Sequence, residues 1–153
     1  MEDRVLNTAN KTDSRFLWEL RNHPEVRKWS FNSDEIPWED HEKWFSRFLE
    51  TPGHIFYLIQ QNNENLGYVR FSKDDSRIVI DVAVKPGVQS KGLGSWGLKN
   101  GSLKYIEEFA VQSVYAEIKL SNTPSIKSFS KAGFSQIDKN PEFVIMEFRK
   151  NES

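Results

Sequence analysis

Apolar side chains recur with a helical period in several segments of the chain, and each of these segments is predicted to be a helix. The period is clearest at residues 38–49, where apolar positions fall three or four residues apart until Pro52-Gly53 ends the pattern. The other predicted helices cover residues 12–22, 25–29 (a short turn), 95–109 and 122–132. Gly97 and Gly101 interrupt the helix at 95–109, and we expect them to allow close packing on a sheet.

Runs of β-branched and aromatic residues between the helices predict strands. They cover residues 3–7, 55–60, 66–72, 77–84, 114–120, 134–137 and 143–148. A polar loop at 61–65 joins the second and third of these strands as a hairpin. Strands and helices are mixed along the whole chain, which indicates an α/β fold, and we expect one domain over residues 1–153.

Composition and charge narrow the class of protein. The net charge of −1 gives no broad attraction to nucleic acid. The chain has no Cys, which excludes disulfides and a cysteine nucleophile, and its three His lack metal-ligand spacing, so no metal site is expected. The sequence shows no signal peptide and no apolar run of membrane-spanning length. We therefore expect a soluble, cytoplasmic protein with no membrane partner.

The strand at 77–84 is followed by a turn with two glycines and then by the long helix, an arrangement that can bind an anion. Gly92 and Gly94 lack a Cβ, so a phosphate group can approach the main chain closely. The N–H groups and dipole at the start of the following helix favour negative charge. The Rossmann motif is not met, because the acidic residue expected on a second strand is missing, and no Gly-Lys-Ser/Thr of a P-loop follows.

Two motifs in order along the chain indicate a family. The first is Q-x-x-G-x-G at residues 89–94, after a strand ending in V-x-P, and the second is an Asn-led helix from Asn122 that ends in Gly133-Phe134. Together they resemble the pyrophosphate-binding motif and the second signature of the GNAT superfamily of N-acetyltransferases. The resemblance implies the GNAT fold, an α/β (mixed α+β) fold with a central mixed sheet flanked by helices. It also implies acetyl-CoA as cosubstrate and coenzyme A as product.

The resemblance further implies where acetyl-CoA binds. In the family two adjacent strands splay apart, and the pantetheine arm lies in the gap, where strand backbone groups bind its amides and polarise the thioester carbonyl. The N–H groups of the glycine turn hold the pyrophosphate. The implied binding residues are Val82, Ala83, Val84, Gln89, Ser90, Lys91, Gly92, Leu93, Gly94, Ser95, Asn122, Ser125 and Lys131. Asn122 can also cap its own helix, and Lys91 and Lys131 can instead be solvated lysines.

The general base departs from the family pattern. Many relatives have a glutamate where this chain has Val79. Side chains alternate along a strand, so Asp81 lies on the same face as Val79 and is the local candidate for the base, acting directly or through water. The alternative for Asp81 is an ion pair with Arg77 or Arg70.

The general acid departs from the pattern as well. Relatives often have a tyrosine where this chain has Phe129, and phenylalanine cannot donate a proton to the leaving thiolate. Ser128 is the candidate donor in its place, with Ser125 or water as alternatives. Coenzyme A can also leave directly as the thiolate.

A narrower resemblance concerns the acceptor. Residues 20–30 and 39–45 resemble GNAT enzymes that N-acetylate UDP-linked 4-amino-4,6-dideoxy sugars on the route to pseudaminic acid and similar surface sugars. This implies a nucleotide-linked 4-amino-6-deoxy sugar as the small-molecule amine substrate. The candidate acceptor-binding residues are Arg21, Asn22, Trp29, His41 and Trp44. Arg21 or Arg27 can pair with a diphosphate, and a tryptophan can stack on a base or sugar. His41 and Trp44 can equally be core residues of their helix.

Two other functions remain open. Segments with the pattern Arg-Asn-x-Pro also occur among protein N-terminal and peptide acetyltransferases. A non-catalytic, regulatory acyl-CoA-binding domain is the third interpretation, because the usual Glu and Tyr are missing at positions 79 and 129. A homodimer is compatible with each of these functions.

Overall fold

Strands of the described chain form one mixed sheet, in the spatial order β1-β2-β3-β4-β5-β7-β6. The computed structural model describes residues 3–29, 33–88 and 92–150. Neighbouring strands are antiparallel except β4 and β5, which run parallel. The strands are β1 (Arg4–Thr8), β2 (Ile55–Gln61), β3 (Glu64–Asp74), β4 (Arg77–Val84), β5 (Ser113–Lys119), β6 (Ser135–Lys139) and β7 (Phe143–Arg149).

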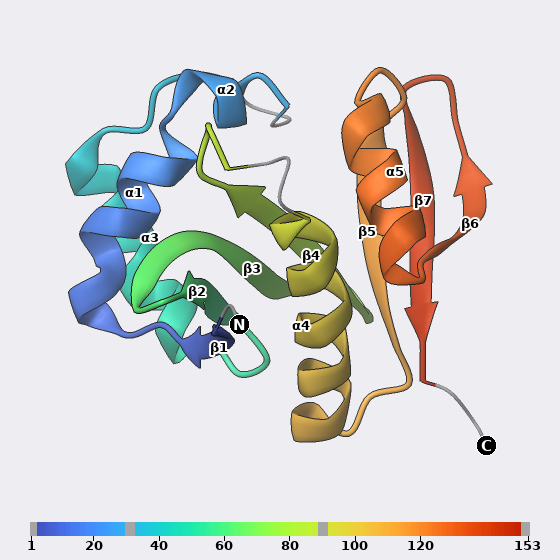
Figure 1. Ribbon diagram of the computed structural model, residues 1–153, viewed down its shortest axis with the longest axis horizontal. Helices are drawn as coiled ribbons and strands as arrows, with labels where there is room; N and C mark the ends of the chain where they lie inside the picture. The colour runs from blue at the N-terminus through green and yellow to red at the C-terminus, as the bar shows by residue number, and fades with distance from the viewer. Residues whose placement is uncertain (1–2, 30–32, 89–91, 151–153) are drawn as a thin grey trace.

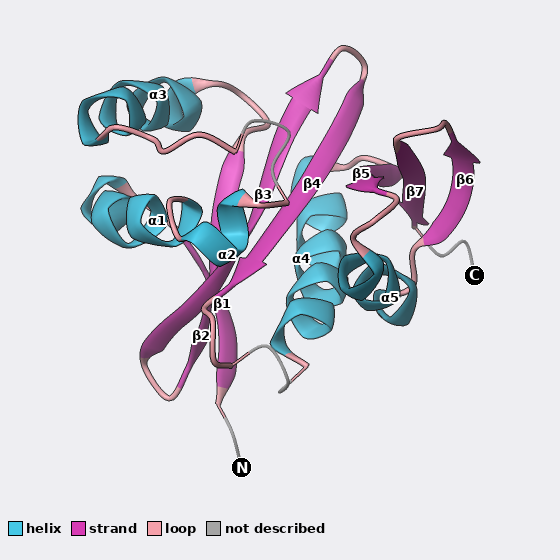
Figure 2. Ribbon diagram, turned by 90° about the horizontal axis from the view of Figure 1, so that it is seen from above, coloured by secondary structure: helices cyan, strands magenta, loops and turns pink. Residues whose placement is uncertain are grey.

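Helices cover both faces of this sheet (Figures 1 and 2). Helices α1, α2 and α3 lie on one side of β1–β4, whereas α4 lies on the other side with α5 packed next to it. The helices are η1 (Lys11–Asp13, a 3-10 turn), α1 (Ser14–Arg21), α2 (Pro24–Arg27), α3 (Trp38–Glu50), α4 (Leu93–Phe109) and α5 (Thr123–Ala132). The predicted mixed sheet flanked by helices is confirmed. Within the described ranges no helix is both long enough and apolar enough to span a membrane.

Each face of the sheet has its own hydrophobic core, which explains why residues 55–59 are apolar without interruption. Alternate side chains of β2 enter the two cores: Phe56 and Leu58 join α1 and α3, and Tyr57 and Ile59 join the core that contains α4. All four side chains are at most 2% exposed. The core under α1 and α3 is the smaller one and is rich in aromatic rings, including Phe45, Phe48, Phe56 and Tyr68. Strand β4 lies between the two cores and contributes residues to both.

Glycines allow the close approaches that this packing needs. A Cβ on Gly97 would lie 2.6 Å from Ile59 Cδ1, which confirms that this glycine permits tight contact between α4 and the sheet. Gly101 packs similarly on Val69, where a Cβ would lie 3.3 Å from Cγ1. On β3, a Cβ at Gly67 would lie 2.5 Å from the carbonyl oxygen of Ala83 on β4. Because that neighbour is backbone, β4 would have to move to accept any larger residue.

The predicted boundaries differ from the structure where turns are tight. The hairpin between β2 and β3 turns on Asn62 and Asn63, with φ of 52° and 66°, so the strands extend into the predicted 61–65 loop. Helix α4 starts at Leu93 rather than Ser95, directly after Gly92 with a φ of 73°. A 3-10 turn capped by Asn10 precedes α1, which starts later than predicted.

Replacing Gly67 with Ala should destabilise the protein, because the new methyl group would meet the Ala83 carbonyl oxygen at 2.5 Å. We expect the free energy of unfolding to fall by about 1–3 kcal/mol in urea denaturation. Gly101→Ala is the matched control: its methyl group would meet only Val69 side-chain atoms, at 3.3 Å or more, and alanine favours the helix by about 1 kcal/mol. A Gly67→Ala protein as stable as the control would contradict the close approach.

Candidate active site

Strands β4 and β5 are neighbours in the sheet but pair at one position, Val79 with Tyr115. On its other edge β4 pairs with β3 from Arg77 to Val84, along its whole length. At this end of β4 the backbone groups of Val82 and Val84 are therefore directed toward β5 without a registered strand partner in the described chain. The carbonyl of Ala83, between them, faces Gly67 on β3 and is not available at the seam. This geometry agrees with the splayed strands that the first motif implies, and it leaves hydrogen-bonding groups for a ligand.

The start of α4 offers an open backbone surface after that end of β4. Gly92 has a φ of 73°, and a Cβ built on it would meet nothing within 4 Å. A Cβ on Gly94 would lie 3.8 Å from Val84 Cγ2, an ordinary contact distance. The Leu93 side chain is fully buried, so only its backbone can face a ligand. Uncrowded glycines at the N-terminus of a long helix fit a phosphate group. Residues 89–91, the other predicted phosphate ligands, lie outside the described residues.

Helix α5 carries the second motif and packs next to α4. Asn122 caps it, because its side-chain oxygen accepts a hydrogen bond from the Ser125 N–H at 3.3 Å. The Ser95 hydroxyl donates to the Ser128 carbonyl at 3.2 Å and so joins α4 to α5. Capping is thus confirmed for Asn122, and the Ser95 hydroxyl has a structural contact with α5, while the coenzyme A contact of Ser95 stays a prediction.

A core residue fills the position where relatives have a tyrosine. Phe129 is 3% exposed and packs edge-on against Phe134, with ring centroids 4.9 Å apart. Its neighbour Ser128 is half-buried, whereas Lys131 is exposed. Phe129 is therefore a core residue, and Ser128, Ser125, water and direct departure of the thiolate stay the alternatives for the leaving group.

A charged and aromatic cluster lies on the face of the sheet that α1 and α3 cover. Arg21, the last residue of α1, places its guanidinium 4.1 Å from the centroid of the Trp44 ring. Arg70 on β3 lies 5.7 Å from the same ring centroid, and its Nη2 pairs with Asp81 Oδ2 at 3.3 Å. The register of β3 and β4 places Arg70 directly opposite Asp81. The structure thus brings three predicted site residues together and adds Arg70 to them.

The buried side chain of His41 forms a hydrogen bond with the guanidinium group of Arg21. Its side chain is 0% exposed, and its Nδ1 lies 2.9 Å from Arg21 Nη1. Burial, and then the positive charge of Arg21, lower the pKa of His41 to about 4. The imidazole is therefore neutral near pH 7, and Nδ1 accepts a hydrogen bond from the guanidinium. A buried ring has no surface for a ligand, so any influence of His41 on the acceptor runs through Arg21.

Tyr68 completes the cluster, although the sequence pattern did not single it out. Burial raises its pKa, and the charge of Asp81 and a hydrogen bond to that carboxylate act in the same direction. Alternation along β3 places Tyr68 and Arg70 on one face, opposite Ala83 and Asp81 in the register. That alternation was the signal from which Tyr68 could have been found.

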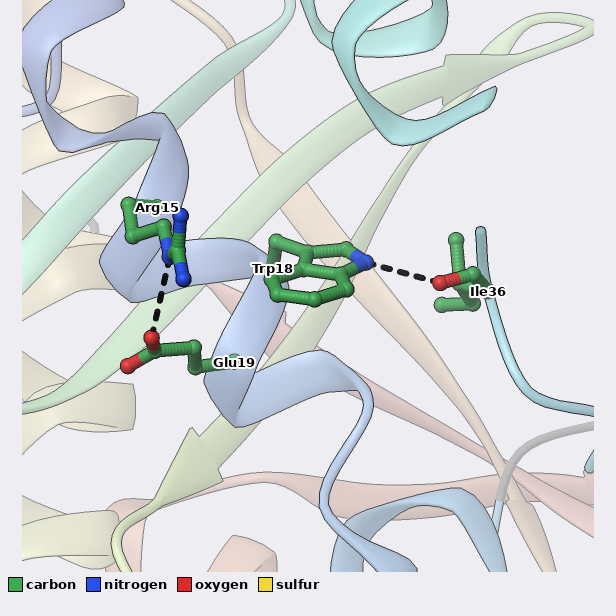
Figure 3. Close-up of polar contacts among 4 residues, drawn as sticks. All are labelled: Arg15, Trp18, Glu19 and Ile36. Atoms are coloured by element: carbon green, nitrogen blue, oxygen red, sulfur yellow. Dashed lines mark hydrogen bonds and ion pairs between the residues drawn. The ribbon is translucent and has the colours of Figure 1, made fainter. Parts of the chain in front are cut away.

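The segment between α1 and α3 is held by contacts with the backbone of Ile36. The Trp18 indole N–H donates to the Ile36 carbonyl at 2.7 Å (Figure 3). The Asn22 side chain accepts from the Ile36 N–H at 2.8 Å and donates to its carbonyl at 3.3 Å. Arg27 donates to the carbonyls of Asn22 at 2.8 Å and Ser33 at 3.0 Å. Asn22 and Arg27 therefore fix this segment.

Trp29 is half-buried and lies two residues after the end of α2, and Lys28 Nζ lies 5.5 Å from its ring centroid. A cavity of about 310 Å³ opens where β4 meets β5, and both residues of the seam pair, Val79 and Tyr115, line it. Strand alternation places Val79 and Asp81 on one face of β4, so the cavity and the candidate base share that face.

In the part of the chain that the structure describes, no three His, Cys, Asp or Glu residues are grouped to hold a metal ion.

Adjacent strands with a single registered pair and a helix N-terminus with open glycines agree with the acetyl-CoA site that the two motifs imply. The chain belongs to the acetyltransferase (GNAT) family, whose family model matches residues 16–134. It is accordingly an N-acetyltransferase. No curated protein matches the chain.

Solved structures share the fold over nearly the whole chain. Aminoglycoside acetyltransferase AAC(6')-Ib in complex with coenzyme A matches with a TM-score of 0.81 and 18% identity, over 97% of this chain and 95% of that one. Spermidine N-acetyltransferase from Vibrio cholerae, in complex with CoA and spermine, matches with a TM-score of 0.83 and 14% identity, over 95% of each chain. A domain from Methanocaldococcus jannaschii matches with a TM-score of 0.83 and 22% identity, over 98% and 100%.

Gly94→Ala should weaken coenzyme A binding at least about tenfold, because its methyl group enters the space that a phosphate needs. The fold should survive, since that methyl group lies 3.8 Å from its nearest neighbour. Gly92 is the poorer test, as its φ of 73° strains any other residue. Gly101→Ala, on the same helix, is the control and should bind normally. Calorimetric titration with unchanged affinity for Gly94→Ala would place the pyrophosphate elsewhere.

His41 should make stability depend on pH. Its pKa falls from 6.5 in the unfolded chain to about 4 in the fold, so the unfolded chain binds more protons between these values. Stability contributed by the neutral imidazole should therefore be complete above pH 6.5 and be lost as the pH falls toward 4. Urea midpoints at pH 7 and pH 5 should differ more for wild type than for His41→Asn, whose amide oxygen can still accept from Arg21. Equal pH dependence in the two proteins would show that His41 is not the group responsible.

Proposed function

We propose that this acetyltransferase transfers an acetyl group from acetyl-CoA to the amine of a nucleotide-linked 4-amino-6-deoxy sugar. The observation that carries the proposal is the cluster of Arg21, Arg70, Trp44 and Asp81 on the face of β4 beside the β4–β5 seam. It combines cations for a diphosphate, an aromatic face for a base or sugar, and a carboxylate for the proton of the amine. The resemblance of the surrounding segments to sugar-nucleotide acetyltransferases supports the same acceptor.

Backbone groups would hold acetyl-CoA. Those of Val82 and Val84 alternate toward the seam and would bind the pantetheine amides, whereas the Ala83 carbonyl faces Gly67 on β3. The N-terminus of α4 would bind the pyrophosphate. Bound acetyl-CoA supplies the activated acetyl group as a thioester. The chain would contribute a strand N–H that polarises the carbonyl of this thioester.

Asp81 would take the proton that the amine must lose. Its side chain is 50% exposed, so water can reach it, and Arg70 holds it from one side. As the nitrogen–carbon bond forms and the carbon–sulfur bond breaks, the amine proton passes to Asp81, directly or through water. The sulfur leaves as a thiolate and takes a proton from Ser128 or from solvent.

A panel of acceptors tests the proposal, with release of free coenzyme A as the measurement. A UDP-linked 4-amino-4,6-dideoxy sugar should give the highest kcat/KM. Kanamycin, spermidine and phosphinothricin represent acceptors named with structural neighbours, and a peptide with a free N-terminus represents protein acetylation. If any of these exceeds the nucleotide sugar, the proposed acceptor is wrong.

Asp81→Asn should lower kcat by about 100-fold or more, since the amide cannot accept the amine proton. Coenzyme A binding should stay unchanged, because the substitution preserves shape and the strand backbone. Asp138→Asn, an exposed substitution on the edge strand β6, is the control and should retain kcat. Normal turnover combined with a loss of thermal stability would instead make Asp81 a structural partner of Arg70.

A further inference from the structure

Two guanidinium groups converge on one aromatic ring. Arg21 and Arg70 lie 4.1 Å and 5.7 Å from the centroid of the Trp44 ring. Burial lowers the pKa of Arg21, and the positive charge of Arg70 lowers it further. Partly buried like charges destabilise a fold unless an anion compensates them.

The compensation within the chain is incomplete. Asp81 is the carboxylate that the described structure places against the two guanidinium groups, through its 3.3 Å contact with Arg70. Tyr68 and His41 add no charge, because burial raises the pKa of Tyr68 and lowers that of His41 to about 4. The cluster is therefore positive near pH 7, although the whole chain carries a net charge of −1.

Arg21 is oriented by a neutral group. His41 Nδ1 accepts from its Nη1 at 2.9 Å, and Trp44 lies under the guanidinium plane. A guanidinium has further N–H donors, and among the described residues no other hydrogen bond of Arg21 occupies them, so they can serve a partner with two acceptor oxygens. The Arg70 side chain is 24% exposed and that of Asp81 is 50% exposed, so a solute can reach the edge of the cluster.

We propose that Arg21 and Arg70 form a binding site for a phosphate or diphosphate group of the acceptor, and that this site selects phosphorylated amines. His41 is a positioning residue of the site, because it reaches the acceptor only through Arg21. The inference rests on the function proposed above in one respect: it places the acceptor on the same face of β4. It does not depend on the acceptor being a nucleotide sugar.

The charge of the cluster separates this chain from two of its structural neighbours. AAC(6')-Ib is described with kanamycin and the Vibrio cholerae enzyme with spermine, which are polycations. Two arginines at the acceptor side repel a polycation and attract a phosphate. Phosphorylated amines and polyamines are therefore the informative pair of substrates.

Calorimetric titration of pyrophosphate into protein saturated with coenzyme A tests the site directly, because the other phosphate-binding surface, at α4, is then filled. Wild type should bind pyrophosphate, and Arg21→Gln or Arg70→Gln should weaken binding by about ten- to a hundredfold, as expected for charge-assisted hydrogen bonds. Arg47→Gln, an exposed substitution on α3, is the matched control and should bind as wild type does. Absence of binding to wild type, or equal binding by all four proteins, would overturn the proposal.

Turnover gives a second, independent measurement. The ratio of kcat/KM for glucosamine 6-phosphate to that for glucosamine should be at least about ten in wild type and should fall toward one in Arg70→Gln. Preference of wild type for glucosamine or spermidine would overturn the phosphate site while leaving acetyl transfer intact. An inert UDP-amino sugar together with an active amino sugar phosphate would reject the proposed acceptor and support the phosphate site.

Discussion

The single backbone pairing of β4 with β5, at Val79 and Tyr115, is the constraint on which the site depends. Two parallel neighbours in a sheet ordinarily satisfy each other's backbone groups, and a buried polar group left alone costs about 1–3 kcal/mol. Here the strands stay in one sheet because the core under α4 holds them, since it contains Ile80 of β4 together with Val114, Ala116 and Ile118 of β5. Packing therefore maintains an opening that backbone hydrogen bonding alone would close.

The smaller, aromatic core provides the second condition for function. Trp44 packs against that core and presents its ring to Arg21 and Arg70, so the guanidinium groups lose water but gain a polarisable face. His41, buried in the same layer, adds a hydrogen-bond acceptor without adding charge. Aromatic packing and charge placement are thus parts of one arrangement, and a substitution in this core is expected to affect both.

Much of the fold was predictable because its periodic segments are strong. The apolar spacing at 38–49 predicted α3 closely, and the two motifs predicted the strand, turn and helix around Gly92. The hairpin between β2 and β3 was predicted, but its turn is tighter than the predicted loop, because the Asn62-Asn63 pair lacks the glycine that usually marks a two-residue turn.

Less of the site was predictable, since it depends on contacts between distant elements. The pairing of Arg70 with Asp81 was one of two alternatives, and the β3–β4 register decides between them. The contact of His41 with Arg21 depends on how α1 crosses α3, which no local pattern encodes. Asn22 lies in a segment with a recognisable pattern, yet its hydrogen bonds to Ile36 required the tertiary structure.

The seam divides the sheet into two plates, β1–β4 and β5–β7, with α4 contacting strands of both. A pantetheine arm bound between β4 and β5 would connect the two parts of the sheet, and the ligand would then contribute to the stability of the fold. Ligands that bind only the native state add stability in proportion to the logarithm of their concentration. On this view coenzyme A would raise the free energy of unfolding by connecting the two parts of the sheet as well as by occupying its site.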